Sequence, residues 1–189
     1  MSTNEYHFIT RWRVRASKEE VSSILGDAKD LQRWWPSVYL NVDVLEPGDG
    51  SGVGSVVELF TKGFLPYTLR WKFRVTESDA PHGFALEAFG DFVGRGVWTF
   101  VQDGEFCEIL YDWRIEAEKP ILKYLSFLMK PIFSANHHWA MQKGLESLQL
   151  ELQRRRAMTL CELDLIPAAP APTWPHRKAK TTFTSRQTV

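Results

Sequence analysis

Three polar side chains stand out because they could act as a general acid or base within an otherwise apolar setting. His137 falls on the apolar face of a helical pattern, Tyr111 lies on the apolar phase of a strand pattern, and Arg95 follows a glycine-rich bend. Such groups act on a proton only within hydrogen-bond reach of the reacting atom and with a suitable pKa. For His137 the alternative is a structural histidine, hydrogen-bonded near the end of the core.

Other classes of site have weaker support. The segment 48–54 is glycine-rich, but it joins two strands and lacks the lysine and hydroxyl residue of a phosphate-binding loop. His137 and His138 point in different directions on a helix, without a carboxylate at metal-ligand spacing, and Cys107 and Cys161 form no C-x-x-C pair. Acidic residues in the strands alternate with apolar ones, as solvated side chains do. We therefore expect no metal and no cofactor.

Composition narrows the class of protein. The chain has 23 basic and 23 acidic residues, which excludes a uniformly cationic protein that coats nucleic acid, so we expect no nucleic-acid partner. Apolar residues make up 44% and aromatic residues 13%, which excludes wholesale disorder. No secretion signal is visible, and the most apolar stretch, residues 120–133, is too short for a transmembrane segment. These features predict a soluble, cytoplasmic protein.

The elements that position these residues begin with a strand. Apolar and polar residues alternate over residues 6–15, which predicts a strand with one dry face. Ser17 and Glu20 have the spacing of a capping box and predict the start of a short helix. A second short helix, capped by Asp30, has to end before Pro36, since proline disfavours helical geometry at the preceding residue.

Six further segments are predicted to be strands, because turn residues rather than helical patterns separate them. They are residues 40–45, 53–61, 67–75, 84–89, 92–101 and 107–115. Strands joined by short turns favour an antiparallel meander over a parallel α/β sheet.

A long helical pattern follows, from about Phe133 to Arg156 and after Pro131, with His137 and Met141 on its apolar stripe. At 1.5 Å per residue, roughly 24 residues span about 36 Å, enough to cross several strands. The sequence therefore predicts an α+β fold: a seven-stranded curved antiparallel sheet wrapped around a long C-terminal helix, with two short helices after the first strand.

The composition changes after this helix. Residues 1–156 form the predicted folded domain, whereas residues 157–189 are rich in proline, end with basic residues and are predicted to be a disordered tail. Within the tail, residues 160–166 could extend the helix or pack as a short apolar segment. The basic end could be simply solvated or could contact an acidic partner.

The element order and several short patterns resemble the START/Bet v 1-like (SRPBCC) superfamily, specifically its bacterial polyketide cyclase/dehydrase-like members. The patterns are Phe8-x-x-x-Trp12-x-Val14 leading into Ala16-x-x-Glu19-x-Val21, then Arg33-Trp34-Trp35-Pro36, Gly94-Arg95-Gly96-x-Trp98 and Tyr111-x-Trp113. The resemblance covers about residues 4–156 and implies a helix-grip fold. The superfamily includes lipid and sterol carriers, aromatic polyketide cyclases, dioxygenase subunits and chaperone activators, so the fold does not settle the chemistry.

The resemblance implies an elongated apolar pocket between the sheet and the long helix. The expected ligand-binding residues are Trp12, Tyr67, Trp71, Phe73, Trp98, Tyr111, Trp113, Phe133, His137 and Met141. Trp98 shares a phase with Gly94 and Gly96, but its strand is apolar on both faces, which leaves its orientation open. Each tryptophan taken alone could equally be ordinary core.

Three functions follow as hypotheses. The first is a carrier or sensor of a hydrophobic or aromatic small molecule, lipid-like or polyketide-like, because inward rings are many and placed acid or base groups are few. The second is a polyketide cyclase/dehydrase-type enzyme that uses His137, Tyr111 or Arg95. The third is a protein-interaction or chaperone-activating module, suggested by the tail. The sequence leaves the ligand and the oligomeric state open.

Overall fold

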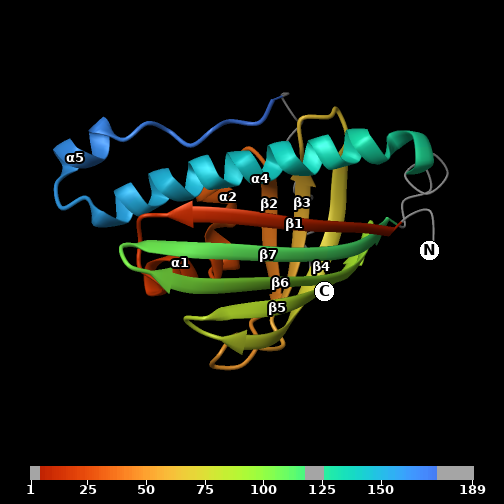
Figure 1. Ribbon diagram of the computed structural model, residues 1–189, viewed down its shortest axis with the longest axis horizontal. Coiled ribbons are helices and arrows are strands. Elements are labelled where there is room, and N and C mark those ends of the chain that lie inside the picture. Colours follow the sequence, from red (N-terminus) through yellow and green to blue (C-terminus); the bar gives the residue numbers. More distant parts are fainter. Residues whose placement is uncertain (1–4, 118–125, 174–189) are drawn as a thin grey trace, which may run out of the picture.

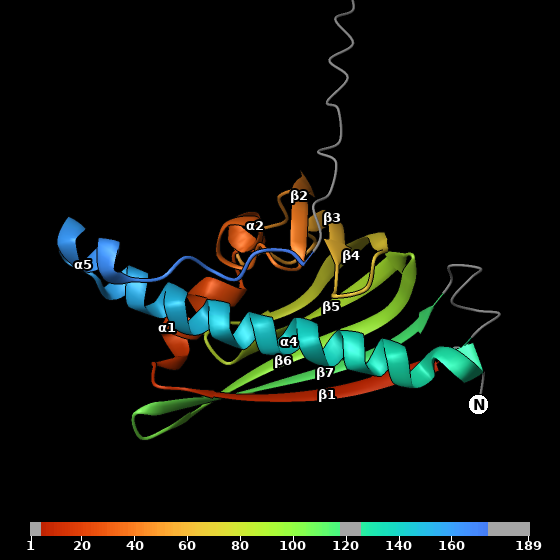
Figure 2. The same cartoon turned by 90° about the horizontal axis from the view of Figure 1, so that it is seen from above.

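Seven antiparallel strands form one sheet in the order β1-β7-β6-β5-β4-β3-β2, shown in the computed structural model in Figure 1. The structure describes residues 5–117 and 126–173. The strands are β1 (Glu5–Val14), β2 (Tyr39–Glu46), β3 (Val56–Lys62), β4 (Thr68–Asp79), β5 (Gly83–Gly90), β6 (Phe92–Asp103) and β7 (Phe106–Ala117). Figures 1 and 2 show β2 and β3 running across the direction of β1 and β7, so the sheet curves around a long helix. The predicted helix-grip fold is confirmed.

Two short α-helices and a 3-10 turn connect β1 to β2. They are α1 (Lys18–Leu25), η1 (Ala28–Asp30) and α2 (Leu31–Trp34). The capping box of α1 forms as predicted: the Glu20 amide donates to Ser17 Oγ at 3.1 Å, and the Ser17 amide donates to Glu20 Oε2 at 2.8 Å. Asp30, however, makes no side-chain cap, because its carboxylate instead binds the Arg33 guanidinium one turn later.

The long helix, α4 (Ser126–Arg156), starts earlier than the sequence predicts and contains Pro131. A proline removes only one backbone donor, and this helix continues past it at its N-terminal end. The predicted strand 53–61 starts later, at Val56, because Gly52 and Gly54 adopt positive φ and prolong the preceding loop. In the described part of the chain, no helix is both long and apolar enough to cross a membrane.

The structure describes part of the segment after α4, residues 157–173, and places a short helix in it. A second capping box, between Thr159 and Glu162, starts the separate helix α5 (Leu160–Leu165). Residues 166–173 then run back along α4 (Figure 1), and Thr173 Oγ1 donates to the Phe64 carbonyl at 3.5 Å. Residues 160–166 thus neither extend α4 nor enter the core. The basic end of the tail, residues 176–189, lies outside the described residues.

A glycine allows α2 and α4 to approach closely. Trp35, directly after α2, is 2% exposed, and a Cβ on Gly144 of α4 would stand 2.2 Å from its ring. Because real Cβ atoms do not approach so closely, any larger residue at this position would have to displace the Trp35 ring or the helix. Gly144 is therefore the point at which the long helix and the Trp34-Trp35 pair fit together.

The first prediction follows from this contact. Gly144→Ala should destabilise the protein by about 1 to 3 kcal/mol through overpacking, although alanine is favoured over glycine in a helix by about 1 kcal/mol. Urea unfolding would measure the change. Gly50→Ala is the matched control, because a Cβ there meets nothing within 4 Å and the change should stay below about 1 kcal/mol. A stabilised Gly144→Ala protein would contradict the proposed contact.

Candidate functional site

A cavity of about 140 Å³ lies between α4 and the inner faces of β1, β3, β4 and β7. We call it the helix chamber. Seven of the ten expected ligand-binding residues line it: Tyr67, Trp71, Tyr111, Trp113, Phe133, His137 and Met141. The helical and strand periodicities therefore bring most of the expected residues to one place.

A second cavity of about 320 Å³ lies toward the loops that join β2 to β3 and β4 to β5. We call it the hairpin chamber. Its inner wall includes Phe73, Phe84, Leu86 and Trp98. Trp98, whose orientation the sequence leaves open, faces inward and stacks on Tyr111 with ring centroids 4.0 Å apart. Two expected residues, Phe73 and Trp98, thus belong to this chamber rather than to the first.

Two further expectations are corrected by the structure. Trp12 lines neither chamber, because it is packed between the rings of Trp35 and Trp98, at centroid distances of 5.8 and 5.7 Å. Arg95 is on the outer face of β6, where its guanidinium lies 2.6 Å from the Glu77 carboxylate. Because side chains alternate along a strand, the inward position of Trp98 sends Arg95 outward. Arg95 is therefore removed as a candidate cavity residue.

Several residues that line the helix chamber are not among the ligand-binding residues expected from the sequence. They are Tyr6, Phe8, Trp35, Tyr39, Thr61, Lys62 and Asn136. Tyr6 and Phe8 lie on the apolar phase of the first strand, and that alternation was a sufficient signal. For Lys62 the sequence gives no such signal, because a lysine at the end of a strand is usually solvated. In the structure, however, Lys62 is only 4% exposed.

His137 is a partly buried base that is neutral at pH 7. Its ring stacks on Phe8 with centroids 4.2 Å apart, and its Nε2 is buried and has no hydrogen-bond partner among the described residues. Burial, assisted by the charge of His138, lowers the pKa of His137 to about 4. The sequence left open a hydrogen-bonded structural histidine; within the described residues, Nε2 makes no such bond. At neutral pH the ring can exchange a hydrogen bond with a ligand but is a weak base.

The tyrosines of the chamber are neutral phenols. Burial raises the pKa of Tyr67 to about 12, with a smaller contribution from Tyr6. Burial also raises the pKa of Tyr111 well above its ordinary value, and the nearby Tyr39 phenol adds to this shift. Since ionisation of any of them is disfavoured, these hydroxyls serve as hydrogen-bonding groups rather than as bases.

Polar groups gather at one end of the helix chamber. The Leu65 amide donates to Asn136 Oδ1 at 3.3 Å, and Gly63 lies so close to the Asn136 side chain that a Cβ there would meet it at 2.1 Å. These contacts hold the loop between β3 and β4 against α4. Lys62, beside Gly63, also lines the chamber, and burial lowers its pKa. Lys62, Asn136 and His137 thus all line the helix chamber.

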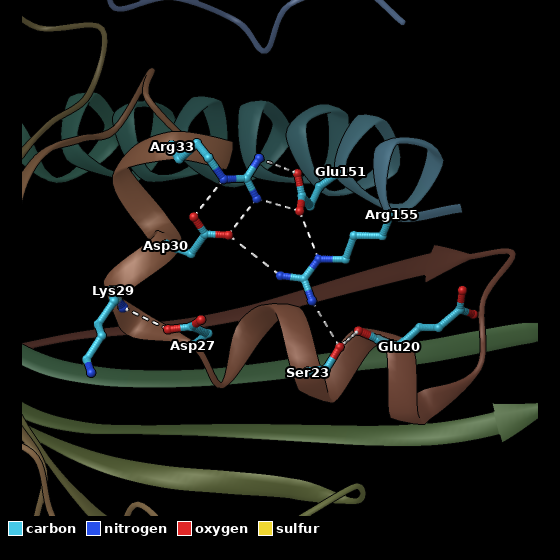
Figure 3. A network of polar contacts seen from close by, with 8 residues as sticks. All are labelled: Glu20, Ser23, Asp27, Lys29, Asp30, Arg33, Glu151 and Arg155. Atoms are coloured by element: carbon cyan, nitrogen blue, oxygen red, sulfur yellow. Dashed lines mark hydrogen bonds and ion pairs between the residues drawn. The ribbon is translucent and has the colours of Figure 1, made fainter. Parts of the chain in front are cut away.

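An ion network around the buried Glu151 joins α2 to α4 (Figure 3). Glu151 of α4 is 1% exposed and accepts hydrogen bonds from Arg33 Nη1 and Nη2 at 2.9 and 2.6 Å and from Arg155 Nε at 2.8 Å. Burial opposes ionisation of Glu151, but the two guanidinium groups outweigh it and keep the pKa of the carboxyl low. Asp30 binds the same Arg33. The network fixes α2 on α4 and so places Trp35 in the cavity wall.

Within residues 5–117 and 126–173, no three His, Cys, Asp or Glu side chains gather as a metal site. The polar side chains described above that line the helix chamber are the His137 imidazole, the tyrosine phenols, the Asn136 amide and the Lys62 amine.

A curved sheet that grips one long helix over an aromatic cavity defines a helix-grip protein of the START/Bet v 1-like type. Residues 7–153 match the model of a family described as "Polyketide cyclase / dehydrase and lipid transport". The chain therefore belongs to this family. No curated protein matches it significantly.

Solved structures with the same fold have low sequence identity to this chain. A protein of Thermus thermophilus has a TM-score of 0.65 and 17% identity, over 80% of this chain and 100% of that one. The ZhuI aromatase/cyclase of Streptomyces sp. R1128 has a TM-score of 0.64 and 18% identity, over 82% of this chain and 97% of that one. Norcoclaurine synthase of Thalictrum flavum has a TM-score of 0.54 and 17% identity, over 81% of this chain and 97% of that one. At these identities the likeness establishes the fold alone.

The second prediction concerns the protonation of His137. Its ring signals in NMR should titrate with a midpoint near pH 4 instead of the ordinary 6.5. Because the folded state disfavours the charged ring, its contribution to stability is present above pH 6.5 and is lost as the pH falls toward 4. The same signals in urea-unfolded protein are the control and should titrate near 6.5. A midpoint at 6.5 or above in the folded protein would contradict the buried placement.

Proposed function

We propose that this protein binds a hydrophobic or aromatic small molecule, lipid-like or polyketide-like, between the sheet and α4, and carries or senses it without changing it chemically. The observation that carries the proposal is an aromatic cavity whose imidazole and phenols are held neutral. General acid and base catalysis works best with pKa values near the working pH. The pKa of His137, about 4, and that of Tyr67, about 12, lie far from it on either side.

The cavity has the make-up of a binding site. Apolar and aromatic walls with few convergent polar groups are typical of small-molecule sites, in which the polar groups orient the ligand. Here the rings of Tyr67, Trp113 and Phe133 supply apolar contact, while His137 Nε2 is a buried polar atom with no hydrogen-bond partner in the described part of the chain. A ligand that bonds to this nitrogen removes the cost of leaving it unsatisfied.

The comparisons support a ligand in this space. The family description names both lipid transport and polyketide cyclisation, and two solved neighbours are named as an aromatase/cyclase and a norcoclaurine synthase. Those names belong to the neighbours. They support the proposal only in that the same fold serves proteins that handle small organic molecules.

An enzyme of the cyclase/dehydrase type is the second candidate. One observation favours it: Lys62, whose pKa is lowered by burial, and His137, whose Nε2 has no hydrogen-bond partner among the described residues, line the same chamber. Desolvated amines can act as bases or nucleophiles at neutral pH. In this alternative Tyr111 would donate a hydrogen bond to the substrate.

The third prediction tests binding. Palmitate, cholesterol and a tricyclic aromatic polyketide would be titrated into the protein and followed by isothermal calorimetry. Ala140→Trp, which fills the helix chamber, should weaken binding by about tenfold or more. Ala135→Trp is the matched control, because Ala135 is exposed on the same helix, and it should leave binding unchanged. Equal affinity of the Ala140→Trp and wild-type proteins, or no binding of any class, would overturn the proposal.

The same samples separate carrier from enzyme. Mass spectrometry of the bound ligand after incubation should recover it unchanged if the protein is a carrier. A cyclised or dehydrated product that disappears in His137→Phe or Lys62→Met would establish the enzyme instead.

A further inference from the structure

We propose that residues 166–173, which we call the strap, form a releasable clamp that holds the loop between β3 and β4 against α4. Release of the strap frees this loop and opens the helix chamber at its Gly63 wall, so the strap sets the rate at which a ligand enters and leaves. The strap lies outside residues 7–153, which the family model matches. The inference rests on the proposed function only for this effect on ligand exchange, since the clamp itself can be tested without a ligand.

The strap joins the C-terminal end of α4 to the loop after β3. After α5 it runs back along α4 (Figures 1 and 2). Near its start, the Arg154 guanidinium of α4 donates to the Pro167 carbonyl. At its end, Thr173 Oγ1 donates to the Phe64 carbonyl at 3.5 Å. Four of its residues are partly buried: Ile166, Ala169, Pro170 and Pro172.

The loop that the strap reaches forms part of the wall of the helix chamber. The Phe64 ring packs edge-on against Trp139 of α4, with centroids 6.3 Å apart, and the Leu65 amide donates to Asn136 Oδ1 at 3.3 Å. Gly63, next to Phe64, and Asn136 both line the chamber. Movement of this loop away from α4 therefore changes the chamber wall directly.

The strap can detach without unfolding of the domain. No residue of α5, which precedes it, is buried, and Leu160 and Leu165 are 80% and 78% exposed. Residues 166–173 belong to no helix or strand. Because segments with few buried contacts open at a lower free energy than the core, the strap is expected to open before the sheet and α4 do.

The prolines of the strap favour its return. Pro167, Pro170 and Pro172 have a restricted φ and no amide hydrogen. A detached strap therefore keeps much of its extended shape and loses less conformational entropy on docking than a glycine-rich segment does. Few contacts together with a stiff backbone are what a clamp that opens and closes repeatedly requires.

Hydrogen exchange of the Leu65 amide tests the clamp in the full chain, without a ligand. Arg154→Met removes the hold on Pro167, keeps a strong helix former and should speed this exchange by about threefold or more, because the loop opens more often. Replacement of the three strap prolines by glycine should act in the same direction, because it raises the entropy of the free strap. Arg95→Met is the matched control: it changes an arginine on the outer face of β6 and should leave Leu65 unchanged.

Two further signals in the same samples decide the outcome. The Ala169 methyl signal reports whether the strap is docked, and it should move toward its position in unfolded protein in both variants. The amide of Leu148, a fully buried residue of α4, should exchange as in wild-type protein. A strap that stays docked in both variants, or detaches without faster exchange at Leu65, would overturn the clamp. Equal acceleration at Leu65 and Leu148 would also overturn it, since strap and core would then open together.

The effect on ligand exchange is measured by stopped-flow fluorescence with 8-anilinonaphthalene-1-sulfonate, a probe of apolar cavities. Arg154→Met should speed binding and release by a similar factor, about threefold or more, and leave the Kd within about twofold, because a clamp acts on access and leaves the contacts of the bound probe intact. Ala140→Trp should abolish most of the signal, since it fills the helix chamber.

Unchanged rates in a variant whose strap has detached would overturn the role of the strap in ligand exchange and leave the proposed function intact. If neither the probe nor the ligand classes named above bind wild-type protein, the proposed function itself fails, whereas hydrogen exchange at Leu65 still decides the clamp.

Discussion

Trp35 lies against the backbone of α4 at Gly144, and the cavity depends on this contact. The ring can approach so closely only because Gly144 has no side chain, and it stays there because Glu151, further along the same helix, binds Arg33. Because Glu151 is buried, loss of Arg33 would leave its charge with Arg155 alone, which favours this position of α2. The sheet, the helix and the Trp34-Trp35 pair together enclose the two chambers.

Desolvation determines the protonation states of the side chains that line the helix chamber. The same burial that makes the cavity attractive for apolar ligands lowers the pKa of His137 and raises that of Tyr67, so that both are neutral over the physiological range. A binding site gains from neutral groups, since they lose less hydration when a ligand displaces water, whereas acid and base catalysis is weakened by them. The neutral His137 and Tyr67 therefore support the proposed carrier or sensor, whereas Lys62 in the same chamber supports the alternative of an enzyme.

Much of the fold could be predicted from the sequence because strand alternation and caps are local signals. The inward positions of Tyr67 and Trp113 follow from clean alternation. The sequence wrongly suggests Arg95 as a cavity residue. Because β6 is apolar on both faces, the sequence does not show which of its side chains point inward, and this depends on the long-range pairing of β6 with β7. Lys62 could not be predicted as a cavity residue, because no local pattern indicates that a charged residue at the end of a strand is buried. The division into two chambers depends on how side chains from distant elements meet, which one sequence does not reveal.

The central claim is that the space between sheet and helix holds a small organic ligand. The most direct test is native mass spectrometry of the full chain purified from its own host under conditions that preserve non-covalent complexes. The account predicts an added mass that disappears on denaturation, belongs to a hydrophobic or aromatic small molecule and is absent from Ala140→Trp. Recovery of only the bare chain mass from wild-type protein, or the same added mass from both proteins, would contradict it.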